Sequence, residues 1–427
     1  MYHCTISMFL AITASVKGSR SSFTRSACDV AFHPFEVLEC ILRCVCSQYR
    51  RAAHYNITHL RRQSFYALPS AQMELLSAPP FELPKTFDAV DAAIDHNAKI
   101  AEVVLATGLE AYGMNHDSTE WHGAATPSDM DKVRSTIRQL YRDWSAEGVL
   151  ERKACYEPML EALDHFFQQV VPAERSEVSL LIPGAGLGRL VFEACKAGYR
   201  VEGNEISYHQ LFVSNWILNY AKEARKWQLY PWALNFSNHT SRDMQLRKVS
   251  IPDLVVSNEL DTASKRMNSK VHAYQRMSMA AGDFCVTYKH PDYEAEYDAA
   301  LTCWFIDTAP NLIAYIDTVK HCLKPHGIWI NHGPLLWHFE STGAPQKAKS
   351  EGDTRAPTSA GLGSASDQGI GEPGSFELTD EEVCQLVERC GFHIEEKRLG
   401  EAAGYIHDTE SMMQSTYRPS FWVARRL

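Results

Sequence analysis

The sequence lacks the cysteine and histidine spacings that mark a metal site or a disulfide framework. Its 12 cysteines form no CxxC pair and no ladder of alternating Cys and His residues, so neither a zinc site nor a set of disulfides is indicated. We therefore expect no metal. Free thiols are typical of a reducing compartment, and we expect a cytoplasmic location, with the nucleus as a possible second one.

A long apolar run and a cluster of basic residues are also missing. The segment "ISMFLAITASV" (Ile6–Val16) is too short to span a bilayer and lacks the basic start of a secretory signal. A net charge of -10 and a pI near 6.0 argue against a nucleic-acid or membrane partner, because phosphate contacts need clustered Lys and Arg. A small-molecule substrate or a protein partner is expected instead.

The chain divides into regions of different pattern. Its 427 residues, 45% of them hydrophobic, can bury a sizeable core. Residues 1–34 are expected to be a poorly structured extension. Residues 35–174 carry apolar side chains at three- and four-residue intervals, which predicts an all-helical cap, with two of its helices separated near Gly148. Residues 341–375 are rich in Gly, Ser, Ala and Pro and are expected to be a disordered insertion.

Strand-like and helix-like runs alternate in the remaining region, residues 175–427. This alternation predicts an α/β fold with a mainly parallel, doubly wound sheet and helices on both faces. Thr379 and Glu382 form a candidate capping box at the start of a late helix, and Gly391 is its candidate stop. The predicted strands lie within Val178–Pro183, Tyr199–Glu205, Tyr297–Asp307, His326–Pro334, Phe392–Gly400 and Ser420–Arg426.

The first strand, turn and helix of that region carry a glycine motif. "LLIPGAGLGRL" places Gly184, Gly186 and Gly188 after an apolar strand, and Glu205 ends the next strand 21 positions after the first glycine. A dinucleotide turn needs GxGxxG, so that the helix packs close to the strand and faces a pyrophosphate. The spacing here is GxGxG. It favours S-adenosylmethionine, which has no phosphate, with Glu205 accepting hydrogen bonds from the ribose hydroxyls.

Several longer segments resemble a known family. The chain is similar, from about Phe35 to its end and broken chiefly by the insertion, to the carnosine N-methyltransferases, which methylate the histidine ring of carnosine to give anserine. The resemblance implies a class I Rossmann-like methyltransferase domain with an N-terminal helical cap, and S-adenosylmethionine as the methyl donor. It is carried by "IPGAGLGRL", "GNEIS", "LYPWALNFSN", "SMAAGDF", "TCWFIDTAPNLIAYIDTV", "LKPHGIWINHGPLLWHFE" and "SMM".

The resemblance also implies which residues bind the donor. Arg142 would hold the donor's carboxylate in a bidentate pair, and Gln139, one helical turn earlier, would share its face. The glycine turn and Glu205 match the family's binding turn and ribose acceptor. The donor-binding set implied in this way is Gln139, Arg142, Gly184, Gly186, Glu205, Asp283 and Phe284 at the adenine, and Cys303 at the methionine end.

Asp307, His338 and Tyr417 are the acceptor-side residues that the resemblance implies. Asp307 ends an apolar run at the carboxyl edge of the predicted sheet, where it could also cap the helix that follows. A neutral imidazole attacks a methyl group without a strong base, so the carboxylate's expected role is to accept the ring N–H and to stabilise the imidazolium that forms. Where the family shows a run of aromatic hydroxyls, this chain keeps only Tyr417 after Ser415 and Thr416.

Three functions stay open at this point. The chain could methylate carnosine or a related imidazole dipeptide, methylate a histidine or another side chain within a protein, or bind the donor or a partner without catalysis. Polar residues kept together at the predicted sheet edge disfavour the last of these. The helical cap is the surface through which a homodimer would form.

Overall fold

The computed structural model describes residues 7–9, 49–111, 127–338 and 376–427. The predicted insertion 341–375 lies outside the described residues. So does the predicted extension 1–34, apart from one short strand, β1 (Ser7–Phe9), which runs parallel to β6 at one edge of the main sheet. At this strand the structure differs from the expected poorly structured extension. Met8 and Phe9 lie at the edge of the sheet, where β6 would otherwise have unpaired backbone groups.

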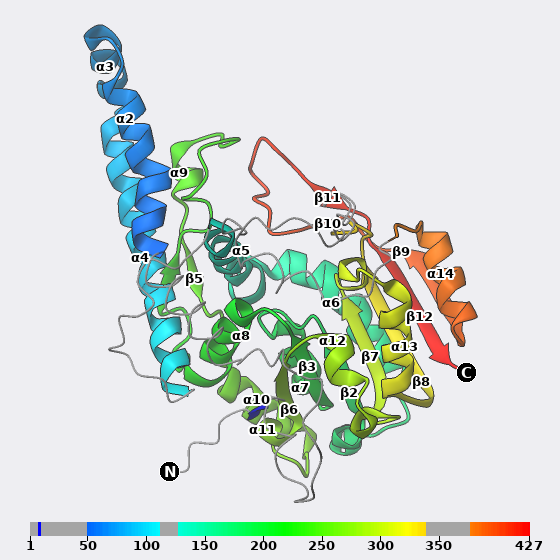
Figure 1. Ribbon diagram of the computed structural model, residues 1–427. Helices are drawn as coiled ribbons and strands as arrows, with labels where there is room; N and C mark the ends of the chain where they lie inside the picture. The colour runs from blue at the N-terminus through cyan, green and yellow to red at the C-terminus, as the bar shows by residue number, and fades with distance from the viewer. Residues whose placement is uncertain (1–6, 10–48, 112–126, 339–375) are drawn as a thin grey trace, which may run out of the picture.

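An eight-stranded sheet forms the centre of the molecule (Figure 1), with the strand order β1-β6-β3-β2-β7-β8-β12-β9. Only β12 is antiparallel to its neighbours, β8 and β9. The predicted mainly parallel sheet is therefore confirmed, as is the predicted fold class. Besides β1, its strands are β2 (Ser179–Pro183), β3 (Arg200–Glu205), β6 (Met277–Ala281), β7 (Tyr297–Cys303), β8 (Leu323–Gly333), β9 (Phe392–Leu399) and β12 (Ser420–Arg426).

Strand β6 was not predicted. Its sequence, "MSMAA", contains neither β-branched nor aromatic residues, so its propensity for strand is low. It forms because β3 on one side and β1 on the other supply hydrogen-bonding partners. Two short antiparallel pairs lie outside the main sheet: β4 (Trp227–Leu229) with β5 (Val249–Ile251), and β10 (Ala403–Gly404) with β11 (Thr416–Tyr417).

Helices cover both faces of the sheet. They include α7 (Arg189–Lys196), α8 (Tyr208–Asn215) and its π-helical extension η3 (Trp216–Tyr220), α10 (Val256–Met267) and α11 (Ala273–Arg276). Later in the chain come α12 (Phe284–Tyr288), α13 (Leu312–Cys322) and α14 (Asp380–Arg389). The short elements are η2 (Pro172–Glu177), α9 (Arg242–Gln245), η4 (Pro291–Tyr293) and η5 (Ile306–Thr308).

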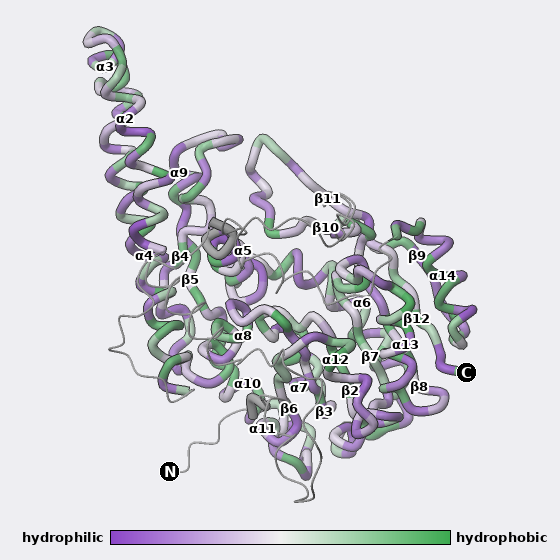
Figure 2. The backbone as a smooth tube through the Cα atoms, in the orientation of Figure 1, coloured by the Kyte–Doolittle hydropathy of each residue, from purple (hydrophilic) through white to green (hydrophobic). Residues whose placement is uncertain are grey.

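The region before the sheet is helical. A hairpin of η1 (His54–His59), α2 (Leu60–Tyr66), α3 (Ser70–Ser77) and the long α4 (Leu83–Ala111) projects from the body (Figure 1). Hydrophilic and hydrophobic residues are mixed along its length (Figure 2). Two further helices, α5 (Pro127–Trp144) and α6 (Val149–Phe166), are separated at Gly148, as predicted.

The capping box predicted for α14 is confirmed. The Thr379 hydroxyl accepts from the backbone N–H of Glu382, and the Glu382 carboxylate accepts from the backbone N–H of Thr379. At the other end of the helix Gly391 has a φ of 96°, a left-handed conformation that glycine adopts without strain. The helix therefore begins and ends where its sequence signals place it.

Successive side chains of β2 enter different cores. Leu180 and Ile182 of β2 pack on one face of the sheet, and Leu181 between them packs on the other with Trp329 and Trp422. The first core also contains apolar residues of α4, α5 and α6, so the helical cap and the sheet share it.

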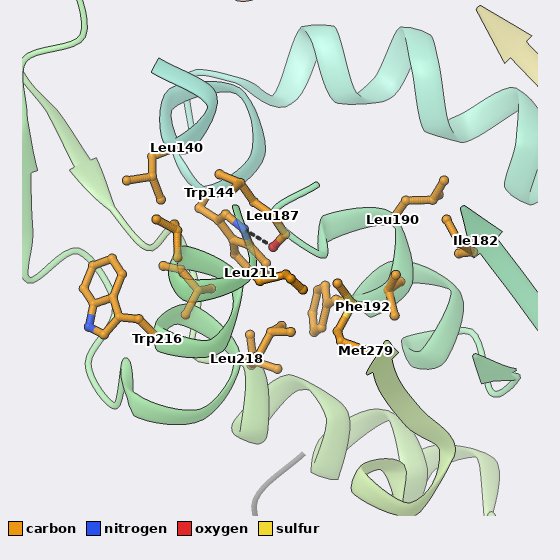
Figure 3. Close-up of a cluster of buried hydrophobic side chains, with 14 of the residues drawn as sticks. Leu140, Trp144, Ile182, Leu187, Leu190, Phe192, Leu211, Trp216, Leu218 and Met279 are labelled. Atoms are coloured by element: carbon orange, nitrogen blue, oxygen red, sulfur yellow. Dashed lines mark hydrogen bonds between the residues drawn. The ribbon is translucent and has the colours of Figure 1, made fainter. Parts of the chain in front are cut away.

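The end of α5 is attached directly to the glycine turn. The indole Nε1–H of Trp144 donates to the backbone carbonyl of Leu187 at 3.0 Å, and the ring packs beside Phe192 and Leu211 (Figure 3). Trp144 is fully buried. The predicted donor residues on α5 are thereby fixed relative to the turn at the sheet edge.

Strand β3 tolerates no side chain at Gly203. A Cβ at this position would lie 2.6 Å from Met279 Sδ and 2.7 Å from Val191 Cγ2. We expect Gly203→Ala to lower the free energy of unfolding by about 1–3 kcal/mol through overpacking. Denaturant titration measures the loss, with Thr262→Ala, at an exposed residue of α10, as the control. An unchanged midpoint for Gly203→Ala would show that the neighbouring side chains move away freely.

Candidate functional site

A cleft opens at the carboxyl ends of the parallel strands. It encloses about 1430 Å³, including solvent at its mouth. Every predicted site residue except Asp307 and Tyr417 lines it. The lining residues that had been predicted are Gln139, Arg142, Gly184, Gly186, Glu205, Asp283, Phe284, Cys303 and His338.

Glycine is required at two positions of the turn for different reasons. Gly184 has a φ of 65°, and a Cβ there would lie 2.4 Å from the ring of Phe305. Gly186 has a φ of 56° and no heavy atom within 4 Å of where its Cβ would be. A ligand can therefore approach the backbone of the turn closely at Gly186.

Glu205 is attached to this turn through its carboxylate. One oxygen accepts from the backbone N–H of Gly186 and the other from that of Ser207, both at 2.8 Å. The side-chain amide of Gln210 lies against this carboxylate. The amide oxygen of Gln210 accepts from Gln139, and the amide nitrogen of Gln210 donates to the two Glu205 oxygens at 3.1 and 2.9 Å. Gln139 of the cap thus reaches Glu205 of the sheet through one intermediate side chain.

Arg142 faces the cleft with part of its guanidinium already engaged. Its Nε and Nη2 donate to the two oxygens of Asp143 at 2.7 and 2.9 Å, and Tyr156 donates to the same carboxylate. Burial opposes the charge, but Asp143 outweighs burial and holds the pKa of Arg142 well above its usual value. The Arg142 guanidinium is therefore permanently charged. A ligand carboxylate can form a bidentate pair with it at the outer edge, formed by Nη1 and Nη2.

Asp283 and Phe284 lie where β6 ends. One Asp283 oxygen accepts from the backbone N–H of Val286 at 2.9 Å and so caps α12. Phe284 is 3% exposed and packs edge-on against Phe305 and Tyr315, which also line the cleft. Aromatic rings thus form this end of the cleft, and Phe284 contributes only a small part of its own ring.

Cys303 and Trp304 lie at the end of β7, next to the glycine turn. Trp304 has a φ of 55°, which is rare for a bulky residue, and its indole donates to Cys155 Sγ at 3.3 Å. Burial raises the pKa of the Cys155 thiol to about 11 and also raises that of Cys303 well above its usual value. Both thiols are therefore protonated at neutral pH and do not act as nucleophiles.

Asp307 lies behind the cleft wall, in η5, with 2% of its surface exposed. Its Oδ2 accepts from the backbone N–H of Leu336 at 3.0 Å. Its backbone carbonyl accepts from the backbone N–H of His338 at 3.2 Å. Burial raises the pKa of the carboxyl, while the Leu336 amide and His338 act in the opposite direction. The alternative role as cap of α13 is wrong, since Asn311 caps that helix by accepting from Ala314 N–H.

His338 and Tyr417 flank this wall differently. His338 is exposed and lines the cleft. Tyr417, in β11, is not part of the lining; its ring meets Trp304 edge-on at 5.1 Å between centroids. Tyr417 therefore contacts Trp304 of the cleft wall from outside the lining.

Among the described residues, no three His, Cys, Asp or Glu side chains converge as metal ligands. None of the helices in that part of the chain is both long and apolar enough to cross a membrane.

Comparison with known proteins assigns the family. The family profile described as carnosine N-methyltransferase matches residues 119–427. The chain belongs to the carnosine N-methyltransferase family. The carnosine N-methyltransferase of Schizosaccharomyces pombe is 34% identical over 88% of this chain and 92% of its own, and that of Mus musculus is 35% identical over 88% and 83%.

Solved structures add only a distant likeness. Magnesium protoporphyrin IX methyltransferase from Synechocystis, solved with bound SAH, is 14% identical and covers 68% of this chain and 93% of its own, with a TM-score of 0.33. A likeness this low carries no argument, and the Rossmann-like class rests on the strand order of the sheet. The resemblance inferred from the sequence motifs is confirmed by the family match.

In this member of the carnosine N-methyltransferase family, sequence reasoning missed several residues of the cleft, among them three that contact predicted residues or line its wall. Gln210, Trp304 and Tyr405 all line it. Trp304 stood inside a quoted motif, "TCWFID", but nothing in the sequence shows its left-handed backbone. Tyr405 follows a strand of two residues, too short to produce a pattern.

Glu205→Ala is expected to weaken binding of S-adenosylhomocysteine, the product of the expected donor, by about 1.5–3 kcal/mol, the range for hydrogen bonds to a charged group. The turn would loosen as well, because Gly186 and Ser207 lose their acceptor. Isothermal calorimetry measures the change, and exposed Glu223→Ala is the matched control. Equal affinity in wild type and Glu205→Ala would remove the carboxylate from the donor site.

Proposed function

We propose that this protein transfers a methyl group from S-adenosylmethionine to the imidazole ring of carnosine, giving anserine. The observation that carries the proposal is the convergence of the predicted donor residues and His338 on one cleft. Membership of the family adds support, because the relatives from Schizosaccharomyces pombe and Mus musculus are named carnosine N-methyltransferases.

The donor half of the cleft fits S-adenosylmethionine, which supplies an electrophilic methyl group when bound. Glu205 offers two carboxylate oxygens to the ribose hydroxyls, beside the open backbone of Gly186. Arg142 offers the outer edge of its guanidinium to the amino-acid carboxylate. The rings of Phe305 and Tyr315, stacked at 4.9 Å, form the wall for the adenine.

The acceptor half needs residues that orient a neutral imidazole. A free imidazole has a pKa near 6.5, so at neutral pH most of the ring is unprotonated and nucleophilic. His338 lines the cleft beside the segment that Asp307 holds. We assign Asp307 to positioning His338 and to stabilising the positive charge that develops on the acceptor ring, with Tyr417 supporting the wall through Trp304.

To test the function, purified protein is incubated with labelled S-adenosylmethionine. The acceptor in each reaction is carnosine, another histidine dipeptide, or a histidine-containing protein extract. We expect label on carnosine, and mass fragmentation then shows which ring nitrogen is methylated. Label on protein alone would favour the protein-histidine alternative. Donor binding without transfer to any acceptor would favour a non-catalytic relative.

Asp307→Asn tests the charge separately from the shape. The amide oxygen can still accept from Leu336 N–H, so the segment stays in place, but the negative charge beside His338 is lost. We expect turnover of carnosine to fall on the order of a hundred- to a thousandfold, with donor affinity unchanged. Single-turnover rates measure the loss, and Asp317→Asn, at an exposed residue of α13, is the control. Near wild-type rates for Asp307→Asn would leave Asp307 with a structural role only.

We also propose that the projecting hairpin mediates a homodimer. Tyr66, Leu75 and Phe81 near its tip are 63%, 62% and 53% exposed. Apolar side chains gathered at one end of a helical hairpin suit a self-complementary interface.

The variant Tyr66→Lys with Leu75→Glu is expected to convert a dimer into a monomer, because charges replace apolar contact area. Sedimentation velocity at micromolar concentration measures the mass. Leu150→Glu, at a residue of α6 that is 70% exposed, is the control. A monomeric wild-type protein would refute the assignment.

A further inference from the structure

We infer that Glu151 is a positioning residue that holds Tyr405 against the donor cleft. The segment Tyr405–Ser415, called the strap below, connects β10 to β11 and begins with Tyr405. The inference rests on the donor site of the proposed function and adds a group that lies outside the cleft lining described above.

Tyr405 occupies a central place in the wall of the cleft. It lines the cleft and also a smaller cavity behind the glycine turn. The Arg142 guanidinium lies over its ring, 5.1 Å from the centroid, and the Trp304 ring lies 4.8 Å away. Arg142 and Trp304 flank the place expected for the methionine end of the donor, so Tyr405 covers that place from the strap.

Local structure alone does not hold the strap there. Strands β10 and β11 pair over only two residues each, and between them the chain arches from the sheet edge toward α9 (Figure 1). An exposed segment of this length, with no regular structure, would be mobile without further contacts. Contacts with the helices must therefore fix the Tyr405 end.

Glu151 of α6 supplies those contacts. Its carboxylate accepts from Ile406 N–H at 2.8 Å and from His407 N–H at 3.0 Å, and it meets His407 Nδ1 at 3.0 Å. Glu151 is 7% exposed. A buried carboxylate with paired backbone N–H donors is a strong anchor, since hydrogen bonds to charged groups are roughly twice as strong as neutral ones.

Gly404 shows how closely the strap is packed at this point. A Cβ on Gly404 would lie 1.7 Å from His407 Nδ1. Any side chain there must push the His407 ring away from Glu151. Gly404→Ala is thus a second way to loosen the anchor while leaving Glu151 unchanged.

The distal half of the strap has its own attachments. Arg247 pairs with Asp408 at 2.5 Å and with Glu410 at 3.3 Å, and the carbonyl of Asn238 accepts from Met412 N–H at 2.9 Å. Loss of the Glu151 contacts therefore loosens the Tyr405 end, where the Arg138 guanidinium still donates to the Ile406 carbonyl at 3.4 Å, and leaves the rest of the strap attached.

The test measures binding of S-adenosylhomocysteine to the full chain by calorimetry, together with kcat and the KM for the donor. Glu151→Gln keeps the size but places an amide N–H among donors, so we expect Kd and KM for the donor to rise about tenfold, with kcat at saturating donor within about threefold of wild type. Gly404→Ala should show the same pattern. Glu157→Gln, on the same helix and paired with Lys153 at 3.7 Å, is the matched control and should bind as wild type does.

A double-mutant cycle with Tyr405→Ala separates positioning from general stability. If Glu151 acts through Tyr405, then Glu151→Gln causes no further loss of donor affinity in the Tyr405→Ala background. A full additive loss, or unchanged affinity in Glu151→Gln with the melting temperature intact, would overturn the inference while leaving the proposed function standing. Absence of binding by the wild-type protein would overturn both, whereas carnosine refused as acceptor with donor binding normal affects only the proposed function.

Discussion

The hydrogen bond from the Trp144 indole to the Leu187 carbonyl is the contact on which the site depends. It joins the last residue of α5 to the glycine turn, and two neighbouring contacts reinforce it: Arg189 donates to the Asp143 carbonyl, and Asp253 N–H donates to the Trp144 carbonyl. Arg142 and Gln139 lie within the last two turns of this helix. Their distance from the turn is therefore set by buried contacts rather than by flexible loops.

Electrostatic compensation accompanies this rigid geometry. Asp143 balances the charge of Arg142, and Asp253 balances Arg189 and Arg152 at 2.8 and 3.3 Å. Each of these buried charges has a partner, as the cost of desolvation requires. The cleft consequently offers a ligand a few polar groups in fixed directions, the outer edge of Arg142 and the carboxylate of Glu205. The walls between these groups are largely aromatic.

Local sequence signals predicted the parts of the site that local geometry determines. The glycine turn, the acid that ends β3 and the capping box of α14 each depend on residues within one turn or one βαβ unit. The burial of Asp307 behind Leu336 and the shielding of Tyr417 by Trp304 depend on segments that meet only in the folded chain. Strand β6 was missed for the same reason, because its neighbours rather than its own residues make it a strand.

The shared core has a consequence for how the chain is made. Helices α4 to α6 leave the ribosome before strand β2 and all later strands, and their buried residues Val104 and Leu163 belong to a core that also contains Phe421 of β12. The core that covers the apolar faces of the cap is thus complete only after β12 has joined the sheet. Folding of such a chain is governed by non-local contacts and exposes it to aggregation during translation, which makes it a natural client for chaperones.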